Sequence, residues 1–195
     1  MTAASRFPGI LVLSAPSGGG KTSLARALAG SRSDAEIAVS HTTRAPRPGE
    51  TDGVHYQFVN AARFEEMIRQ QAFIEYATVY GNLYGTSYDA VDALFASGKH
   101  AILDIDWQGA RNVRRRYPRA TTVFIMPPSV ETLERRLRER NQDSESVIRQ
   151  RMELVEQEIS HKDEFDVVVV NENFDESLAA LHQILDSVDT GQMPV

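Results

Sequence analysis

The sequence predicts an α/β fold in which a parallel β-sheet is flanked by helices. Short apolar runs that suit buried strands alternate along the chain with segments whose apolar residues recur at helical spacing. This alternation is typical of a parallel sheet covered by helices. Between residues 40 and 88 the order changes, because strand-like segments lie close together there and are separated by turn residues. The sequence therefore also predicts a small insert with a mixed or antiparallel sheet.

The composition indicates one globular domain and argues against several classes of protein. Of the 195 residues, 42% are hydrophobic and 25% are charged, which is ordinary for a folded domain. The net charge of −6 argues against a nucleic-acid partner, because general binders of nucleic acid need an excess of Lys and Arg. The absence of cysteine excludes disulfides and thiolate zinc sites. With no signal-peptide pattern and no run of about 18 apolar residues, we expect a cytoplasmic protein without a membrane partner.

The first strand and helix enclose a phosphate-binding pattern. The apolar run Ile10–Leu13 suits a buried strand, and a helical run follows the glycine-rich stretch SAPSGGGKT. Gly20, Lys21 and Thr22 stand where the pattern G-x-x-x-x-G-K-[ST] requires them, whereas Ala15 replaces its first glycine. A small residue fits there if its φ is negative. The N–H groups of such a loop and the positive end of the helix bind one anion, so we favour a triphosphate site over a plain turn before a helix.

The remaining strands and helices follow from apolar runs and apolar stripes. The expected strands are Glu36–Ser40, Val54–Val59, Phe73–Tyr80, His100–Asp106, Ala120–Met126 and Asp166–Asn171. The expected helical stripes are Val130, Leu133 and Leu137; Ile148, Met152, Val155 and Ile159; and Phe174, Leu178, Leu181, Leu185 and Val188. A polar break, Arg138–Ser146, separates the first two of these helices.

One basic segment, Arg111–Arg119, could be mistaken for a nucleic-acid patch. Val113 and Tyr117 are four residues apart and can face inward on a helix while the arginines stay solvated. Because the chain as a whole is acidic, we interpret this segment as a surface helix.

A second anion site is predicted inside the insert. Arg44 and Arg47 are three residues apart around a proline, so their guanidinium groups can converge on one phosphate. Tyr56 and Tyr84 can add phenolic donors. Two solvated surface arginines are the alternative, but a neighbouring phosphate loop favours the binding site. Two phosphate sites on one chain indicate a donor and an acceptor that both carry phosphate.

A third group of residues matches the edge of a guanine base. Guanine has two donors, N1–H and an exocyclic amine, together with the acceptors O6 and N7. Glu75 and Asp106 supply carboxylates for the donors, and Ser40 and Thr86 supply hydroxyls for the acceptors. Adenine would turn an acceptor toward a carboxylate, which is repulsive. The alternative for Asp104 and Asp106 is that strand ends are polar wherever a crevice opens in such a sheet.

At this point the chain resembles the guanylate kinases, enzymes that phosphorylate GMP with ATP. Eight segments occur in the order of that family: SAPSGGGKTSL, SHTTRAPRPGE, GVHYQF, FIEYA, GNLYGTS, LDIDWQG, RRLRERNQDSESVIRQRM and VVNENFD. The resemblance implies a P-loop NTPase-type core at residues 1–39, 89–130 and 150–195. It also implies a GMP-binding insert at residues 40–88 and a helical lid at residues 131–149.

The resemblance also implies roles for individual residues. The ATP site would consist of Ala15, Pro16, Ser17, Gly18, Gly19, Gly20, Lys21, Thr22, Asn171 and Glu172, the last standing where the family commonly has Asp. The GMP site would consist of Ser40, Arg44, Arg47, Tyr56, Glu75, Tyr84, Thr86 and Asp106. Thr22 and Asp104 would hold Mg²⁺. The catalytic residues would be Lys21, Arg47, Arg140 and Arg151.

These features predict direct in-line transfer from ATP to GMP, which supplies GDP for purine nucleotide metabolism and GTP synthesis. A phosphate monoester is largely a dianion at neutral pH, so the acceptor needs no general base. What the reaction needs is alignment and charge neutralisation by Mg²⁺, Lys21 and arginines. One alternative is a catalytically inactive guanylate-kinase-like module that binds proteins. Another is a regulatory GTPase, but the chain lacks an NKxD-type guanine loop. The sequence makes no prediction of the oligomeric state.

Overall fold

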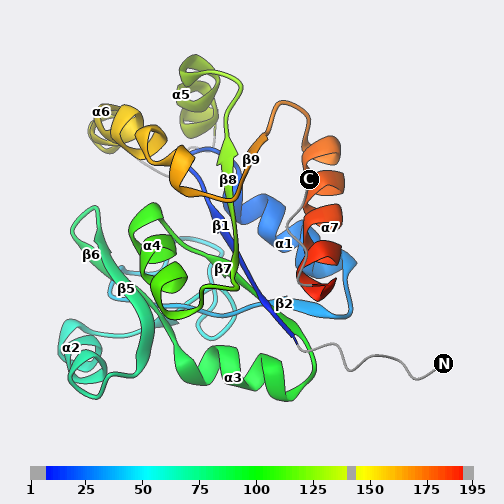
Figure 1. Ribbon diagram of the computed structural model, residues 1–195. Coiled ribbons are helices and arrows are strands. Elements are labelled where there is room, and N and C mark those ends of the chain that lie inside the picture. Colours follow the sequence, from blue (N-terminus) through cyan, green and yellow to red (C-terminus); the bar gives the residue numbers. More distant parts are fainter. Residues whose placement is uncertain (1–7, 140–143, 191–195) are drawn as a thin grey trace.

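The core is a five-stranded parallel sheet. The computed structural model describes residues 8–139 and 144–190. The strand order is β2-β7-β1-β8-β9, and every neighbouring pair is parallel (Figure 1). The strands are β1 (Ile10–Ser14), β2 (Ala35–Ile37), β7 (His100–Asp104), β8 (Thr121–Met126) and β9 (Val167–Val170). The predicted α/β class and parallel sheet are confirmed.

Helices cover the two faces of this sheet because its strands bury side chains on both sides. In β1, Leu11 and Leu13 face one hydrophobic cluster, whereas Ile10 and Val12 face another. The first cluster contains side chains of α1 (Lys21–Ser31) and α7 (Phe174–Thr190), and the second contains side chains of α3 (Tyr88–Ala96) and α4 (Trp107–Arg116) (Figure 1). The continuous apolar runs of the sequence thus reflect burial on both faces.

The insert forms a second, mixed sheet with its own small core. Its strand order is β4-β3-β6-β5, in which β3 and β4 are parallel and the other pairs are antiparallel. Helix α2 places Phe64 and Met67 against Phe73, and the rings of Phe64 and Phe73 stack with centroids 4.5 Å apart. The elements are β3 (His41–Thr42), β4 (Gln57–Phe58), α2 (Ala61–Arg69), β5 (Phe73–Val79) and β6 (Asn82–Ser87).

Helices α5 (Val130–Glu139) and α6 (Glu145–Ser160) stand beside the phosphate loop at one end of the core sheet (Figure 1). They pack against each other through Leu133, Leu137, Ile148 and Val155. Leu137 also approaches the loop, because a Cβ added at Gly18 would lie 3.0 Å from its Cγ. The short helix η1 (Lys162–Glu164) then leads into β9. No helix in the described part of the chain is long and apolar enough to cross a membrane.

Local sequence patterns were wrong about a strand in the insert and about the burial of the first residue of two helices. The alternation in Val54–Val59 yields only the two-residue strand β4, because residues 51–56 form turns in which Gly53 N–H donates to the Tyr56 carbonyl at 2.8 Å. Val54 is therefore 66% exposed. Val130 and Phe174, predicted to begin apolar stripes, are also exposed. Strands β3 and β6 and helices α2 and α3 were not among the expected elements.

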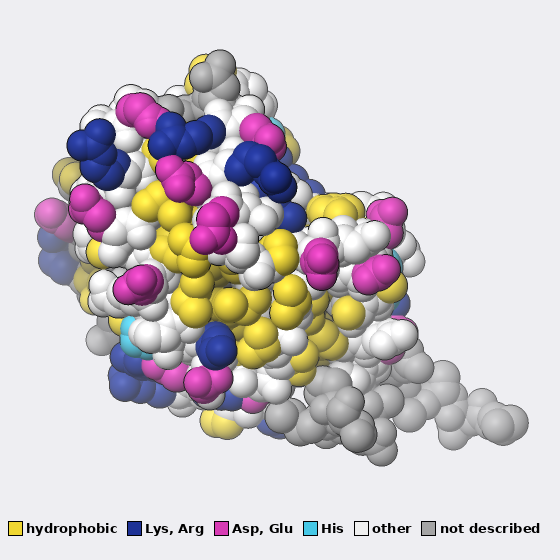
Figure 2. Space-filling view, turned by 90° about the horizontal axis from the view of Figure 1, so that it is seen from above, with side chains coloured by type: hydrophobic (Ala, Val, Ile, Leu, Met, Phe, Trp, Pro, Cys, Tyr) yellow, Lys and Arg dark blue, Asp and Glu magenta, His cyan; other side chains and the backbone are white. Residues whose placement is uncertain are grey.

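Two predictions about surfaces were partly right. Strand β9 exists, but only one of its faces is covered: Val169 is buried, whereas Val168 and Val170 are exposed at this edge of the sheet. Seen from above, hydrophobic side chains form a band across the surface between mixed charges (Figure 2).

In helix α4, Val113 is buried as expected. The arginines of that helix are not simply solvated, because Arg111 pairs with Glu164 and Arg114 with Asp166.

We expect the insert to depend on the stacked rings of its core. Replacing Phe64, which is fully buried, with alanine should lower the free energy of unfolding by roughly 3–5 kcal/mol, because it opens a cavity beside Phe73. Urea denaturation measures the loss. The matched control is Phe174→Ala, at a ring that is 41% exposed, where the expected loss is below about 1 kcal/mol. Equal losses in the two variants would contradict a buried core in the insert.

Candidate active site

The glycine-rich loop between β1 and α1 has the geometry of an anion cradle. Gly18 and Gly20 adopt φ values of 87° and 93°, which residues with a side chain rarely adopt. Helix α1 begins at Lys21, so its N-terminal N–H groups face the loop. Ala15 is not among the described non-glycine residues with positive φ, which are Gln71 and Tyr80. Alanine therefore satisfies the backbone requirement at the position where the pattern has glycine.

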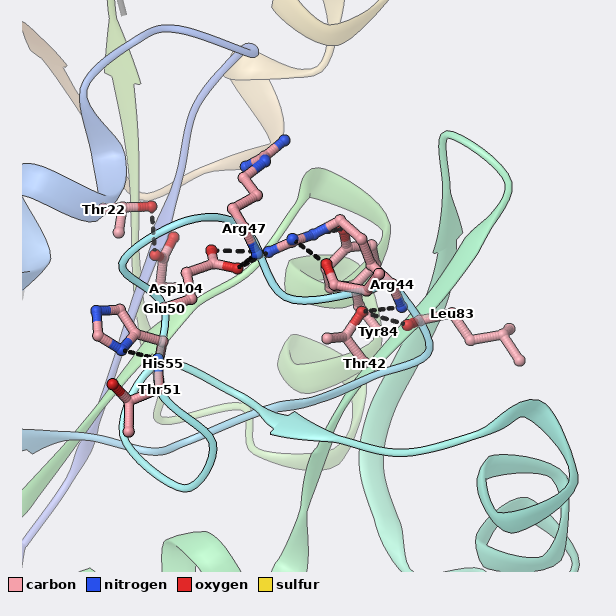
Figure 3. Close-up of polar contacts among 11 residues, drawn as sticks. Thr22, Thr42, Arg44, Arg47, Glu50, Thr51, His55, Leu83, Tyr84 and Asp104 are labelled. Atoms are coloured by element: carbon pink, nitrogen blue, oxygen red, sulfur yellow. Dashed lines mark hydrogen bonds and ion pairs between the residues drawn. The ribbon is translucent and has the colours of Figure 1, made fainter. Parts of the chain in front are cut away.

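Lys21 and Thr22 both contact the end of strand β7. The Nζ atom of Lys21 lies 2.5 Å from Oδ1 of Asp104 and donates a hydrogen bond to the Ile105 carbonyl at 3.0 Å. The hydroxyl of Thr22 donates to Oδ2 of Asp104 at 2.7 Å (Figure 3). The carboxylate of Asp104 thus binds both Lys21 and Thr22, although Asp104 lies more than 80 positions after them in the sequence.

The oxygen atoms at this point suit a magnesium ion. Mg²⁺ prefers oxygen ligands, keeps several waters and is usually bound by one or two protein groups together with substrate phosphates. Thr22 and Asp104 offer a hydroxyl and a carboxylate within 2.7 Å of each other. Among the described residues no group of three or more His, Cys, Asp or Glu side chains could hold a metal ion. The donor set therefore fits an ion that arrives with a triphosphate.

The two arginines of the insert lie in different surroundings. The guanidinium group of Arg44 donates to Glu50 at 2.8 and 2.9 Å and to the hydroxyl of Tyr84 at 3.2 Å, and it lies over the ring of Tyr56 at 5.5 Å. Glu50 also accepts from the backbone N–H of Arg47 at 2.7 Å. Figure 3 shows the side chain of Arg47 directed away from the pair formed by Arg44 and Glu50. The loop is therefore fixed by Arg44, while Arg47 reaches the central cavities.

The carboxyl group of Glu75 is buried in the insert beside a small cavity. A register shift between Phe73 and Glu75 turns it inward, and only 4% of the residue is exposed. Oε1 accepts from the backbone N–H of Thr86 at 2.8 Å, and the hydroxyls of Thr86 and Ser40 lie 3.0 Å apart. Burial, and to a smaller extent the charge of Asp106, raises the pKa of Glu75 to about 7.

Asp106 lies between this cavity and helix α4. It caps the helix, because Oδ1 accepts from the backbone N–H of Gly109 at 2.8 Å. Gly109 is needed at this place, since an added Cβ would lie 2.5 Å from Oε2 of Glu75. The helix cap and the close approach of α4 to β5 thus place the two carboxyl groups on one side of the cavity.

Two cavities, of about 890 and 160 Å³, share one wall. The larger is lined by the whole phosphate loop and extends to Asn171 and Glu172. The smaller is lined by Ser40, Glu75, Tyr84 and Asp104, among others. Both are lined by Ser17, Lys21, Arg47, Tyr56, Val79, Tyr80 and Asp106. Ligands in the two cavities would therefore come close to each other at this common wall, which we call the junction.

Most of the residues predicted for the site lie around these cavities. Arg44 and Thr86 line neither cavity but contact residues that do, Tyr84 and Ser40. Arg151 lines the smaller cavity and donates to the hydroxyl of Ser17 at 3.2 Å. Arg140 lies outside the described residues.

Sequence reasoning missed several residues of the site. Glu50 orients the arginine loop and stands within the quoted segment SHTTRAPRPGE. Asn171 was assigned to the ATP site, but the sequence did not indicate that its side-chain amide donates to the carbonyl of Gly19 at 3.0 Å and so supports the loop. Tyr80 and Glu158, which line or border the junction, carried no signal in any local motif.

Comparisons with known proteins agree with this geometry. The family model described as guanylate kinase matches residues 8–188. A guanylate kinase of Haemophilus influenzae is 52% identical over 181 residues, covering 91% of this chain and 87% of the relative. One of Escherichia coli strain K12 is 50% identical over 178 residues, covering 90% of this chain and 86% of the relative. The crystal structure of guanylate kinase from Anaplasma phagocytophilum matches with a TM-score of 0.77 at 33% identity, covering 94% of this chain and 87% of that one.

The raised pKa of Glu75 makes the stability of the protein depend on pH. In the folded state Glu75 keeps its proton up to about pH 7, whereas in the unfolded state it loses the proton near its ordinary pKa of 4.5. The contribution of this group to the free energy of unfolding therefore falls as pH rises between these two values. Glu75→Gln cannot titrate. Relative to that variant, the wild type should lose roughly 1–3 kcal/mol of unfolding free energy between pH 5 and pH 8. Chemical denaturation at both pH values measures this, with Glu153→Gln as an exposed control. Parallel profiles for wild type and Glu75→Gln would contradict the assignment.

Proposed function

The chain belongs to the guanylate kinase family and phosphorylates GMP with ATP, and from this premise we propose that direct in-line transfer takes place at the junction of the two cavities. The shared wall is the observation that carries the proposal, since one cavity is lined by the phosphate loop and the other by the buried Glu75. Two ligands in these cavities would meet with their phosphates beside Lys21 and Arg47. The product GDP would serve the synthesis of GTP.

The larger cavity is the proposed ATP site. The phosphates of ATP would lie on the loop formed by residues 15–20 and at the N-terminus of α1, both of which line this cavity. The adenine would lie at the far end, near Asn171 and Glu172. When ATP binds, the ammonium group of Lys21 would leave the Asp104 carboxylate and bind phosphate oxygens instead.

Thr22 and Asp104 are the proposed ligands of Mg²⁺. When bound, the ion would neutralise charge on the phosphate oxygens of ATP. The loss of the Lys21 contact on ATP binding would free one oxygen of Asp104. Lys21 would then bind the phosphates directly, while Asp104 and Thr22 would hold the ion.

The smaller cavity is the proposed GMP site. Glu75 and Asp106 would accept hydrogen bonds from the guanine N1–H and amine, while Ser40 and Thr86 would donate to the acceptors of the base. Arg47, Tyr56 and Tyr84 would bind the phosphate, and Arg44 would hold this loop through Glu50 and Tyr84. Because Glu75 has a raised pKa, binding of guanine would require it to release its proton near neutral pH.

Transfer needs charge neutralisation and the exclusion of water. Residues 131–149 are proposed to act as a lid that closes over both nucleotides, with residues 1–39, 89–130 and 150–195 as the core and 40–88 as the GMP-binding insert. Arg151, only 8% exposed and in contact with Ser17, would act on the transferring group, joined by Arg140. GMP arrives as a nucleophilic dianion, so no side chain has to remove a proton from it.

The alternative of an inactive binding module is not favoured, because the family match spans nearly the whole chain and Lys21, Thr22 and Asp104 are all in place.

We expect the buried carboxyl group to decide the choice of acceptor. GMP should exceed AMP, CMP and UMP in kcat/KM by roughly 10³- to 10⁵-fold, because the other bases leave a buried acceptor without a donor. A coupled assay over the four monophosphates measures this. As a control, Glu75→Gln should reduce the value for GMP far more than the value for AMP. An AMP value within about tenfold of GMP would contradict the assignment of Glu75 and Asp106 to guanine.

The proposed ion site predicts a change in magnesium dependence. Asp104→Asn and Thr22→Val should raise the Mg²⁺ concentration needed for half-maximal turnover by roughly tenfold or more, since each removes an oxygen ligand or weakens it. Thr22→Ser keeps the hydroxyl and should behave like the wild type. The measurement is a Mg²⁺ titration of initial rates at fixed ATP and GMP. An unchanged midpoint in both variants would exclude these residues as ligands.

A further inference from the structure

The carboxyl group of Glu158 joins three parts of the protein at the junction. Glu158 lies on helix α6, and its Oε2 accepts from the backbone N–H of Ser17 in the phosphate loop at 3.0 Å. Its Oε1 accepts from the hydroxyl of Tyr80, in the insert, at 3.1 Å. One side chain therefore connects the ATP side, the GMP side and the helix that follows the proposed lid. Neither the motifs nor the proposed substrate contacts assign it a role.

Arg151 lies on the same face of α6, seven residues or about two turns before Glu158. Its Nη1 donates to the hydroxyl of Ser17 at 3.2 Å, and its guanidinium carbon lies 5.3 Å from the centroid of the Tyr80 ring. Val155, buried between the two, fixes this face of the helix against α5. Ser17 and Tyr80 thus each contact both Arg151 and Glu158.

The hairpin between β5 and β6 sets the backbone of Tyr80, because Val79 pairs with Asn82 and leaves Tyr80 and Gly81 as the two turn residues. The φ of Tyr80 is 48°, and the next residue, Gly81, has a φ of 76°, so the turn between β5 and β6 passes through two left-handed residues. A tyrosine in this region costs of order 1 kcal/mol or more and persists where surrounding contacts hold it. The ring faces Arg151 and the hydroxyl reaches Glu158, and these contacts keep the side chain at the junction.

Burial of an acidic group beside a phosphate site needs a reason. Glu158 is partly buried, and burial raises the pKa of its carboxyl group against the opposing effect of the hydrogen bonds from Ser17 and Tyr80. An acidic side chain here repels the phosphates of both substrates, which opposes their binding. Direct contact with substrate phosphate would increase this repulsion. Glu158 is therefore better suited to orient neighbouring groups than to bind substrate.

We propose that Glu158 is a positioning residue for phosphoryl transfer, which holds Arg151 in register with the phosphate loop and the insert. The carboxylate of Glu158 binds the backbone of Ser17 and the hydroxyl of Tyr80. The guanidinium group of Arg151 in turn contacts the Ser17 hydroxyl and the Tyr80 ring. The inference rests on the proposed transfer at the junction. Because misplacement of a catalytic group by about 1 Å can cost 10²-fold in rate, loss of this brace should affect kcat more than binding.

The test compares four variants for kcat, for the KM of each nucleotide and for thermal stability. Glu158→Ala should lower kcat by roughly 10- to 100-fold while both KM values change by less than about threefold. Glu158→Gln, whose amide can still accept from Ser17 and donate to Tyr80, should recover most of the rate. Tyr80→Phe keeps the ring and should show an intermediate loss. Glu156→Ala, an exposed glutamate on the same helix, is the matched control and should match the wild type.

A double-mutant cycle separates bracing from general stabilisation. If Glu158 acts through Tyr80, the combined Glu158→Ala and Tyr80→Phe variant should be no slower than Glu158→Ala alone. Multiplicative losses in the pair, an unchanged kcat in Glu158→Ala, or a loss confined to KM or thermal stability would overturn the proposal. Should Glu158→Ala fail to fold, an unchanged kcat in Tyr80→Phe would overturn it.

Lys21→Ala distinguishes failure of this inference from failure of the transfer model. Inactive Lys21→Ala together with fully active Glu158→Ala would reject the brace and keep the junction. Full activity of Lys21→Ala would reject the junction itself, and the brace with it.

Discussion

The contact between Lys21 and Asp104 is the interaction on which the rest of the site depends. It joins the start of α1 to the end of β7, which is the neighbour of β1 in the core sheet. Two residues after Asp104 the chain reaches Asp106, which caps α4 and faces the smaller cavity. The positions of the phosphate loop and of the carboxylate proposed to bind guanine therefore depend on the same strand end. Exchange of this ion pair for phosphate oxygens would couple ATP binding to the wall that both cavities share.

The distribution of charge around the junction explains how an acidic protein can bind two anions. The chain has a net charge of −6, yet Lys21, Arg47 and Arg151 all line the smaller cavity near its shared wall. The carboxyl groups of Glu75 and Glu158 are held by backbone N–H groups of Thr86 and Ser17 and not by these cations alone. Burial raises the pKa of both carboxyl groups. The cations and the hydrogen-bonded carboxyl group of Glu75 thus line one cavity, so that the local charge there differs from the net charge of the chain.

The sequence predicted the features that arise from local chemistry and missed those that arise from distant contacts. The parallel sheet, the phosphate loop and the inward face of α4 follow from apolar runs, glycines and helical spacing. The strand expected at Val54–Val59 was wrong over most of its length, because turn hydrogen bonds competed with the alternation. Glu158 could not be found, since its partners Ser17 and Tyr80 are 141 and 78 residues away. Burial of Glu75 likewise depends on a bulge that no local pattern indicates.

The central claim is a single in-line displacement between two nucleotides held at the junction, and the stereochemistry at phosphorus tests it most directly. ATP carrying a γ-thiophosphoryl group made chiral with oxygen isotopes would be reacted with GMP, and the configuration of the thiophosphoryl group in the product would be determined. Direct transfer past Lys21, Arg47 and Arg151 requires inversion at phosphorus. Retention of configuration would indicate two successive displacements through a phosphorylated side chain, and it would contradict the account.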